Sequence, residues 1–342
     1  MRIIKRKEEK FMKIKKIAVM ALAGAMAAMA LTGCSGTGTA KKDANTEKYS
    51  IGLVQLVQHE ALDAATQGFQ DKLVELLGEE NVEFDLQNAS GDSATCATIA
   101  NQFVSSGKDL IFANATPALQ AAAAATSDIP ILGTSITDYA TALDIDNWTG
   151  ATGRNITGTA DLAPLAEQAA MFKELLPDAK NIGLIFCSSE ANSKYQVDIV
   201  KEELTKLGYT CTEYSFADSN DVAAVVTTAV GAMDALYIPT DNTAAANTEI
   251  IANIANPANI PIIASEEGIC RGCGIATLSI SYYGLGQVTG EMAYDVLVNG
   301  ADPATTEVKY TDKLTKMYMK DRAEALGITI PEGYEELVTE AE

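Results

Sequence analysis

Asp109-Leu-Ile-Phe-Ala-Asn-Ala-Thr-Pro-Ala-Leu-Gln120 is the stretch that decides the fold, because it predicts a buried strand running directly into a helix. The apolar run at 110–112 is typical of a parallel strand that is covered on both faces. We expect Thr116 to cap the helix and Pro117 to take its first position. The helix start then presents unpaired N–H groups at the carboxyl end of a strand, where open α/β sheets bind small anions such as carboxylates.

Strand and helix patterns alternate on both sides of this stretch. The first array has strands at 50–56, 82–86, 110–112 and 129–133, separated by helices at 61–77, 92–106 and 116–126. After an irregular zone at 138–158, a second array has helices at 161–175, 191–206, 219–231 and 242–254 and strands at 181–186, 209–215, 234–238, 260–264 and 274–280. A helix at 283–298, a strand at 314–319 and a terminal helix follow. The alternation predicts an α/β protein with two doubly wound parallel-sheet lobes.

The second array reads as an insertion, after which the chain returns to complete the first lobe. We therefore predict that lobe I comprises residues 49–157 and 281–310 and that lobe II comprises residues 158–280. Residues 311–342, with the late strand and the terminal helix, are predicted to pack across the lobes.

The front of the chain has the features of an export signal. Residues 1–33 contain a basic segment and then an apolar run that suits a signal-peptide core but is short for a membrane span. The run ends in Leu31-Thr-Gly-Cys34, which matches the lipobox of bacterial lipoproteins. We expect Cys34 to carry the lipid and residues 34–48 to form a flexible tether, with Met1 or Met12 as the start. The alternative is an ordinary secretory signal with an incidental cysteine.

The charge of the chain restricts its partners. The formal net charge is −21, and the part after the basic leader reaches −27. A surface this acidic argues against nucleic acid and anionic lipid as binding partners. It suits an extracytoplasmic protein that a lipid anchor holds at the bacterial cell membrane.

Metal and redox chemistry have little support in the sequence. His59 is the only histidine, so a zinc site at Cys270-Arg-Gly-Cys273 would have no second ligand pair. The C-x-x-C pair could carry redox chemistry, form a local disulfide or remain as free thiols. No G-x-S-x-G, Walker lysine loop or strand-linked G-x-G-x-x-G is present, so we predict no catalytic residue and no cofactor.

Several loops carry hydroxyl, amide or carboxylate groups where a strand ends and a helix begins. Each loop alone is explained by helix capping, because Ser, Thr, Asp and Asn are the usual cap residues. Together they offer more acids and amides than caps require, and we expect them to face one another between the lobes. Asp138, Asp161 and Asp241 could hold an ammonium group, while helix starts and Thr116 could hold a carboxylate. This charge pattern predicts a zwitterionic ligand, and an amino acid is the simplest ligand of that kind.

The same loops resemble one protein family. The similarity extends over residues 49–331 and is carried by Ile51-Gly-Leu-Val-Gln-Leu-Val-Gln-His-Glu-Ala-Leu-Asp63, Ala115-Thr-Pro-Ala-Leu-Gln120, Asn155-Ile-Thr-Gly158, Glu190-Ala-Asn-Ser193, Pro239-Thr-Asp-Asn242 and Tyr282-Tyr-Gly-Leu-Gly286. The chain resembles the substrate-binding lipoproteins of ABC transporters associated with tryptophan, tyrosine or phenylalanine uptake. The resemblance implies a type 1 periplasmic-binding-protein fold with three crossovers between lobes that close on an amino acid.

The resemblance also implies which residues line the cleft. By position these are Gln55, His59, Thr116, Thr137, Asp138, Asp161, Asn192, Ser193, Asp241 and Glu266. The implied partners are an aromatic amino acid and the ABC permease subunits, with the binding protein acting as a monomer. Nearby candidates for aromatic stacking are Tyr139, Trp148, Tyr282 and Tyr283. The family usually has no C-x-x-C where Cys270 and Cys273 stand, which leaves the role of that loop open.

Two rivals remain beside the solute-binding function. A surface adhesin or sensory receptor could use the same scaffold, and an exposed apolar patch on one lobe would favour it. An enzyme with its active site in the cleft would reveal itself by turnover of small esters, amides or sugars.

Overall fold

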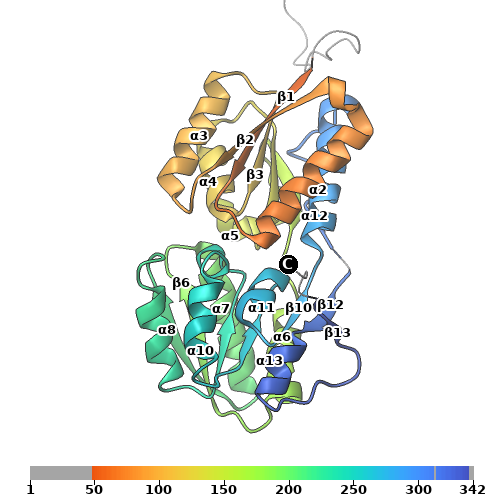
Figure 1. Cartoon of the computed structure of the whole chain (residues 1–342). Coiled ribbons are helices and arrows are strands. Elements are labelled where there is room, and N and C mark those ends of the chain that lie inside the picture. Colours follow the sequence, from red (N-terminus) through yellow and green to blue (C-terminus); the bar gives the residue numbers. More distant parts are fainter. Residues whose placement is uncertain (1–47, 312, 339–342) are drawn as a thin grey trace, which may run out of the picture. The chain divides into compact units, whose positions relative to one another are not determined.

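The computed structural model describes residues 48–311 and 313–338 (Figure 1). Their strands form two sheets. The first has six strands in the order β11-β5-β4-β3-β1-β2, and every neighbouring pair in it is parallel. These strands are β1 (Tyr49–Gln55), β2 (Val82–Asn88), β3 (Leu110–Asn114), β4 (Ile131–Ile136), β5 (Ile156–Ala160) and β11 (Lys309–Tyr310). Its accompanying helices are α2 (Glu60–Leu77), η1 (Glu79–Asn81), α3 (Ser93–Ser105), α4 (Thr116–Ala125), α5 (Tyr139–Leu143), α12 (Tyr282–Tyr294) and η2 (Asp295–Asn299).

The second sheet has seven strands in the order β13-β12-β10-β9-β8-β6-β7. They are β6 (Asn181–Cys187), β7 (Thr210–Phe216), β8 (Ala235–Ile238), β9 (Ile262–Ala264), β10 (Ala276–Ser279), β12 (Thr315–Tyr318) and β13 (Glu335–Glu336). All pairs are parallel except β10 with β12. The helices are α6 (Leu165–Leu175), α7 (Ala191–Lys206), α8 (Val222–Val230), α9 (Asn242–Ala245), α10 (Thr248–Ala255), α11 (Glu267–Cys273) and α13 (Lys320–Ala325).

Both sheets are covered on both faces, because alternate residues of each strand point to opposite sides. In β3, Leu110 and Phe112 join the cluster formed with α2 and α12, whereas Ile111 joins the cluster formed with α3 and α4. Figure 1 shows these two helix pairs on opposite sides of the first sheet. In the second sheet, Tyr237 packs with α6 and α7, and Leu236 packs with α8, α10 and α11. The predicted doubly wound α/β fold is therefore confirmed.

The chain passes between the two sheets three times. It leaves the first sheet after β5, returns to it at α12 after β10, and leaves it again between β11 and β12. The predicted three crossovers are thereby confirmed. Strands β12 and β13 come from the segment that we expected to lie across the lobes, and they extend the second sheet. Leu314 of the same segment packs against the apolar cluster that contains α6 and α7 and against the cluster of Ala61, Ala65 and Leu285. The exact lobe boundaries stay a prediction.

Several local expectations were wrong. Thr116 does not cap α4, because the cap position belongs to Ala115, and Thr116 is already helical. The irregular zone contains α5 and the strand β5, so the helix predicted from residue 161 begins at Leu165. The helix predicted at 242–254 is two helices, α9 and α10. The stretch with the two cysteines forms α11, which we had not predicted. These short elements carry too few residues for a clear periodicity.

Within residues 48–311 and 313–338, no helix combines the length and the apolar character needed to cross a bilayer. The predicted signal peptide, Cys34 and almost all of the tether lie outside the described residues.

Helices α2 and α12 approach so closely at two glycine positions that no side chain fits there. A Cβ atom on Gly286 would lie 2.0 Å from the carbonyl oxygen of Ala65, and one on Gly68 would lie 2.1 Å from that of Tyr283. Because both obstacles are backbone atoms, a rotamer change cannot relieve the clash. Glycine at these positions lets the returning helix α12 dock on lobe I.

We predict that Gly286→Ala lowers the free energy of unfolding by at least about 2 kcal/mol, because the two helices must move apart. Urea denaturation followed by circular dichroism measures this. Gly231→Ala is the matched control, since its new Cβ would meet nothing closer than 3.6 Å. Equal midpoints for the two variants would contradict the close-packing argument.

Candidate functional site

The predicted site residues gather at the carboxyl ends of strands from both sheets. Gln55 ends β1 and His59 follows it, Thr116 follows β3, Thr137 and Asp138 follow β4, and Asp161 follows β5. In the second sheet, Asn192 and Ser193 open α7 after β6, Asp241 follows β8 and Glu266 follows β9. Parallel strands of one sheet end at a common edge, so each sheet contributes one group of polar loops.

Hydrogen bonds and an ion pair join the loops of one lobe to those of the other. His59 Nε2 lies 3.2 Å from Asn242 Oδ1, and Gln196 Nε2 donates to Thr137 Oγ1 at 3.3 Å. Glu60 on α2 pairs with Arg271 on α11 at 2.9 Å. These contacts join residues of the two lobes that lie 59 to 211 positions apart in the sequence. The polar loops therefore face one another between the lobes, as expected.

Asp161 is the carboxylate that the local structure explains least. It is 4% exposed, and its Oδ2 accepts a hydrogen bond of 2.9 Å from the Tyr282 hydroxyl. It caps no helix, since the cap of α6 is Pro164. Oδ1 is buried and has no hydrogen-bonding partner among the described residues. Burial raises the pKa of Asp161 to about 6, although the hydroxyls of Tyr282 and Thr137 act in the opposite direction.

Three other predicted acids are helix caps. Asp138 accepts from Thr141 N at 2.7 Å, and Asp241 accepts from Ala244 N at 2.7 Å. Glu266 accepts from the N–H groups of Gly268 and Ile269. The capping alternative weighed in the sequence analysis is thus what these three local structures show. Contact of these carboxylates with a ligand stays a prediction.

Burial keeps two of these caps weakly acidic. Burial, aided by the nearby Glu190 carboxylate, raises the pKa of Asp241 to about 8, and burial raises that of Glu266 to about 7. Asp241 also accepts from Cys187 N at 2.6 Å, which ties the end of β6 to the end of β8. Its two carboxylate oxygens are therefore both engaged within lobe II.

The remaining predicted site residues differ in their hydrogen-bonding partners. Gln55 is committed to lobe I, where it donates to Asp63 at 2.6 Å and accepts from Thr66 at 2.7 Å. Asn192 donates to Thr240 O at 2.9 Å, but its Oδ1 has no partner among the described residues. Thr116 and Ser193 are buried at the starts of α4 and α7.

Backbone strain marks two neighbouring strand ends in the first lobe. Ala115 has φ 87° and ψ 155°, a region used almost only by glycine, and Ser135 has φ 54°. The two turns are adjacent, because Ala115 N donates to Thr134 O. Each such conformation costs about 1–3 kcal/mol and persists where the surrounding structure requires it. The Ser135 hydroxyl is buried and also has no partner among the described residues.

The aromatic candidates have different surroundings. Tyr139 is buried against Trp148 in lobe I, with ring centroids 6.3 Å apart, and its hydroxyl donates to Thr159 O. Tyr283 is 40% exposed and bonds to Asp71 on the surface of α2. Of the four candidates, Tyr282 is the one bonded to a predicted site residue, Asp161.

Cys270 and Cys273 are buried free thiols on α11. Burial raises the pKa of Cys273 to about 12, which makes its reactive thiolate rare at neutral pH. The structure therefore supports the free-thiol alternative over the local disulfide. Arg322 on α13 donates to the carbonyl oxygens of residues 270, 271, 272 and 274. These bonds attach α13 to the end of α11. Among the described residues, no group of three or more His, Cys, Asp or Glu is arranged to hold a metal ion.

Comparison with known proteins identifies the family. Residues 50–341 match the family model described as ABC transporter substrate binding protein. A tyrosine-binding protein of Clostridioides difficile (strain R20291) is 39% identical over 305 residues, which is 86% of this chain and 88% of that protein. The chain belongs to the ABC transporter substrate-binding protein family.

Two solved structures place this substrate-binding protein among type 1 periplasmic binding proteins. A domain from Streptococcus pneumonia in complex with L-Trp is 36% identical, with a TM-score of 0.80 over 84% of this chain and 97% of that one. The open, ligand-free structure of a substrate-binding protein with adhesive properties from Clostridium difficile is 38% identical, with a TM-score of 0.65 over 85% and 100%. The lower score with the open structure agrees with the direct interlobe contacts of this binding protein.

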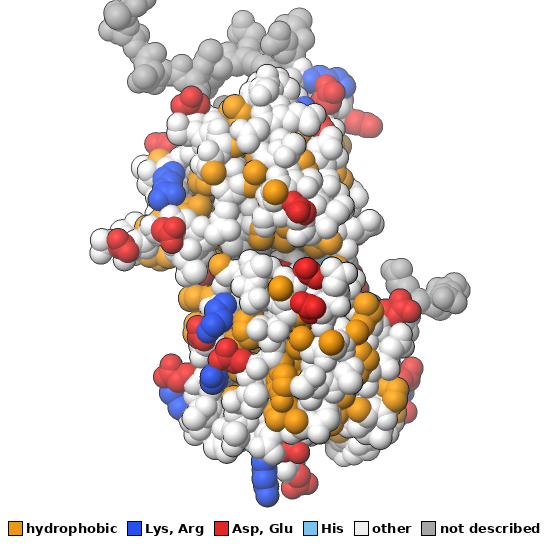
Figure 2. Space-filling view, turned by 90° about the vertical axis from the view of Figure 1, so that its left-hand side faces the viewer, with side chains coloured by type: hydrophobic (Ala, Val, Ile, Leu, Met, Phe, Trp, Pro, Cys, Tyr) orange, Lys and Arg blue, Asp and Glu red, His pale blue; other side chains and the backbone are white. Residues whose placement is uncertain are grey.

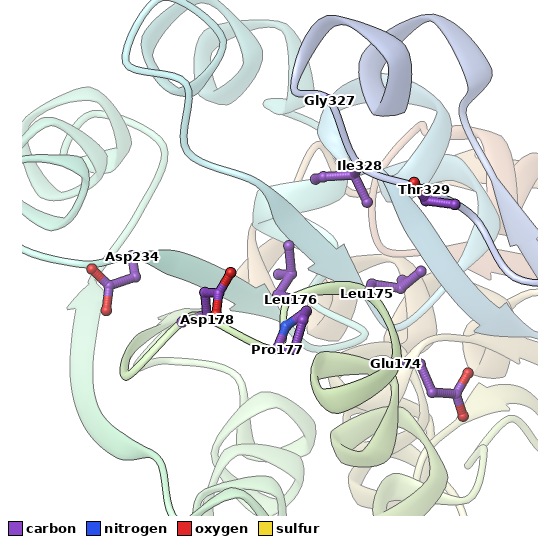
Figure 3. Close-up of a pocket in the computed structure, with 10 residues that line it drawn as sticks. Glu174, Leu175, Leu176, Pro177, Asp178, Asp234, Gly327, Ile328 and Thr329 are labelled. Atoms are coloured by element: carbon purple, nitrogen blue, oxygen red, sulfur yellow. The ribbon is translucent and has the colours of Figure 1, made fainter.

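A pocket elsewhere in this binding protein shares none of these residues. It holds ≈ 550 Å³ and is lined by residues 174–179, Asp234 and residues 327–329. Figure 3 shows the carboxylates of Glu174, Asp178 and Asp234 around it. Asp234 immediately precedes β8, so the pocket lies at the amino ends of the strands. Ligands of open α/β sheets bind at the opposite edge.

Sequence reasoning had not assigned a site role to several residues of the network. Glu190 accepts four hydrogen bonds from Asn242 and Thr243, and Gln196 links Thr137 to the backbone of Thr240. Glu190 lies in a loop that was recognised as polar, but a polar residue at a helix start is the expected cap, and Gln196 lies inside the helix predicted at 191–206. Only the assembled fold shows that these side chains bridge separate loops.

We predict that Asp161 makes the ligand-free protein more stable as the pH falls. Its raised pKa means that the folded state binds the proton more tightly than the unfolded chain, so stability grows from pH 7 toward the unfolded value near 3.8. Between pH 7 and pH 5 this carboxyl should add roughly 1 kcal/mol to the free energy of unfolding. Urea denaturation at both pH values measures it. Asp161→Asn should lose this increment, and an unchanged increment would disprove the assignment to Asp161.

Proposed function

We propose that this protein is the extracytoplasmic, lipid-anchored binding subunit of an ABC importer and that it captures an aromatic amino acid between its two lobes. Two relatives at 36–39% identity support the ligand class, since one is described as tyrosine-binding and the other was solved with L-Trp. The observation that carries the proposal is the buried Asp161 carboxylate, whose Oδ1 is without a partner among the described residues. A buried charge without full compensation is costly, and a ligand ammonium group would compensate it.

The turns after β3 and β4 supply the complementary end of the site. Helix α4 begins at Thr116, directly after the strained Ala115, and its first N–H groups can bind a carboxylate. The Ser135 hydroxyl beside this turn is a further donor, being 7% exposed and unpartnered in the described part of the chain. An α-amino acid carries the matching pair of charged groups.

Closure of the lobes would couple capture to delivery. The interlobe contacts of His59, Thr137 and Glu60 form only when the lobes meet, so a ligand that binds both lobes shifts the population toward the closed form. The closed form is then what the permease subunits would recognise. The protein acts as a monomer and performs no covalent step in this scheme.

We predict that Asp161→Asn weakens amino-acid binding at least about 30-fold, because the neutral amide cannot balance the ammonium charge. Isothermal titration with L-tyrosine and L-tryptophan measures the effect. A thermal-shift screen of the twenty amino acids, purines and sugars first establishes which class stabilises the wild-type protein.

The matched control is Asp92→Asn, which alters a carboxylate that caps helix α3 and is not among the predicted site residues. We expect its affinity to remain within about threefold of wild type. Equal affinities for Asp161→Asn and wild type would remove the ammonium role of Asp161. A screen in which only sugars or purines bind would refute the amino-acid function itself.

The lipid anchor is a separate part of the proposal and rests on Leu31-Thr-Gly-Cys34. Export with cleavage before Cys34 would leave this cysteine as the lipidated first residue. We predict that Cys34→Ala moves the protein from the membrane fraction to the soluble fraction of the producing cells. Immunoblots of the two fractions measure this, and a variant that still sediments with membranes would contradict lipidation at Cys34.

The adhesin alternative has less support in the described residues. Figure 2 shows hydrophobic side chains gathered on the surface of the lobe that contains the second sheet. Helices α8 and α10 have exposed apolar side chains at Ala223, Ala224 and Ile250, and α8 carries no charged residue. Two of these three side chains are small, and nothing in the structure indicates which molecule would cover them. Amino-acid capture remains the function that the site geometry favours.

A further inference from the structure

Helix α11 turns its two cysteines inward and Arg271, which lies between them, outward. Cys270 and Cys273 are buried in the apolar cluster that α11 forms with α8 and α10. Because these two positions are three apart, they lie on one face of the helix, and Arg271 belongs to another face. The Arg271 side chain is 24% exposed. The stretch Cys270-Arg-Gly-Cys273 therefore presents a guanidinium group to its surroundings.

Contacts within the second lobe hold this guanidinium group in place. Its Nη2 donates to Glu267, one turn earlier on α11, and its Nη1 donates to the carbonyl oxygen of Val338. Val338 follows β13, which pairs with β12 in the second sheet. Arg322 fixes the end of the same helix through four carbonyl oxygens. Because all these groups belong to one lobe, Arg271 is held in position whether or not the lobes meet.

A third contact of Arg271 crosses to the first lobe. Its Nε donates to both carboxylate oxygens of Glu60, the first residue of α2, at 2.9 and 3.0 Å. The two helix starts approach closely here, since a Cβ atom on Gly268 would lie 3.2 Å from the Cβ atom of Glu60. The ion pair of Lys201 and Glu213, in contrast, lies within the second lobe. The pair of Glu60 and Arg271 thus forms only when the lobes meet.

Such a pair contributes to the closed form and not to the open one. When the lobes separate, Arg271 keeps its contacts with Glu267 and Val338 and loses Glu60. Exposed ion pairs are usually weak, because two mobile side chains must be ordered to form them. Here the contacts within the second lobe have already ordered Arg271, so less entropy is lost when the pair forms.

We propose that Arg271 is a latch for lobe closure: its guanidinium group, held in the second lobe by Glu267 and the Val338 carbonyl, binds Glu60 when the lobes meet and lengthens the lifetime of the closed form. The latch needs no contact with the solute. It slows release more than capture, because the pair forms only after the lobes have closed. The latch itself does not depend on which solute is bound, and the proposed function supplies only the amino acid used to measure release.

Glu60→Gln should raise the dissociation rate of L-tyrosine about fivefold and leave the association rate within about twofold. A fivefold change corresponds to about 1 kcal/mol, since 1.4 kcal/mol is tenfold. A chase of radiolabelled L-tyrosine measures dissociation, and isothermal titration supplies the affinity from which the association rate follows. Glu213→Gln is the matched control, because it removes an ion pair of 2.7 Å within the second lobe. It should release L-tyrosine at the wild-type rate.

The double variant distinguishes a latch from two separate effects. Arg271→Gln should raise the dissociation rate by a similar factor. The variant that combines Glu60→Gln and Arg271→Gln should release L-tyrosine no faster than the faster single variant, because one pair can be broken only once. Effects that multiply in the double variant, or a Glu60→Gln rate equal to that of wild type, would overturn the latch.

Ionic strength gives an independent test, because salt screens a partly exposed ion pair. The Debye length falls from about 10 Å at 0.1 M salt to about 3 Å at 1 M. The ratio of the Glu60→Gln and wild-type dissociation rates should therefore shrink from about fivefold at 0.1 M NaCl to less than about twofold at 1 M NaCl. A ratio that stays constant with salt would contradict an ionic latch.

The ligand-free protein separates failure of the latch from failure of the proposed function. If no amino acid binds the wild-type protein, the proposed function fails, and small-angle X-ray scattering then tests the latch without ligand. Glu60→Gln should have a larger radius of gyration than wild type, because separated lobes extend the molecule, whereas Glu213→Gln should not. Identical scattering curves for wild type and Glu60→Gln in that case would refute the latch as well.

Discussion

Burial of carboxylates at the strand ends is the constraint on which the rest of the site depends. A carboxylate removed from water needs donors, and each buried acid here finds a different source of them. Glu190 takes four from the first residues of α9, which fastens α7 to the loop after β8. Asp241 takes one from β6 and one from α9. The second lobe therefore presents a rigid set of loops to the first.

Asp161 differs from the structural acids in what remains unsatisfied. Glu266 and Asp241 complete helix starts with both of their oxygens engaged. Asp161 caps nothing and keeps one oxygen without a partner in the described residues, although it is as deeply buried as they are. Burial raises the pKa of Asp161 as it raises the pKa of Asp241 and Glu266, so the free oxygen, and not the pKa, distinguishes Asp161. A cationic ligand group would satisfy that oxygen and lower the pKa of Asp161.

The strained turns of lobe I complement this arrangement. Ala115 and Ser135 hold unfavourable backbone conformations side by side, at the ends of two paired strands. The surrounding sheet stabilises both conformations, because it is buried on both faces and cannot relax locally. Under the proposed function, these turns would offer oriented donors to a ligand carboxylate, and closure of the lobes would be coupled to binding.

The amino-acid sequence by itself determined the fold class, because long apolar strands and amphipathic helices carry their periodicity locally. It also located the polar loops and the resemblance that predicted the family, and placed all ten candidate residues near strand ends. It did not reveal α11, the strand β5 or the capping position of Ala115, since such short segments are decided by tertiary contacts. Nor could it separate Asp161 from the capping acids or show that Glu190 bonds to the first residues of α9. Those distinctions depend on which donors reach each buried oxygen, and residues up to 183 positions apart supply them only when both sheets are assembled.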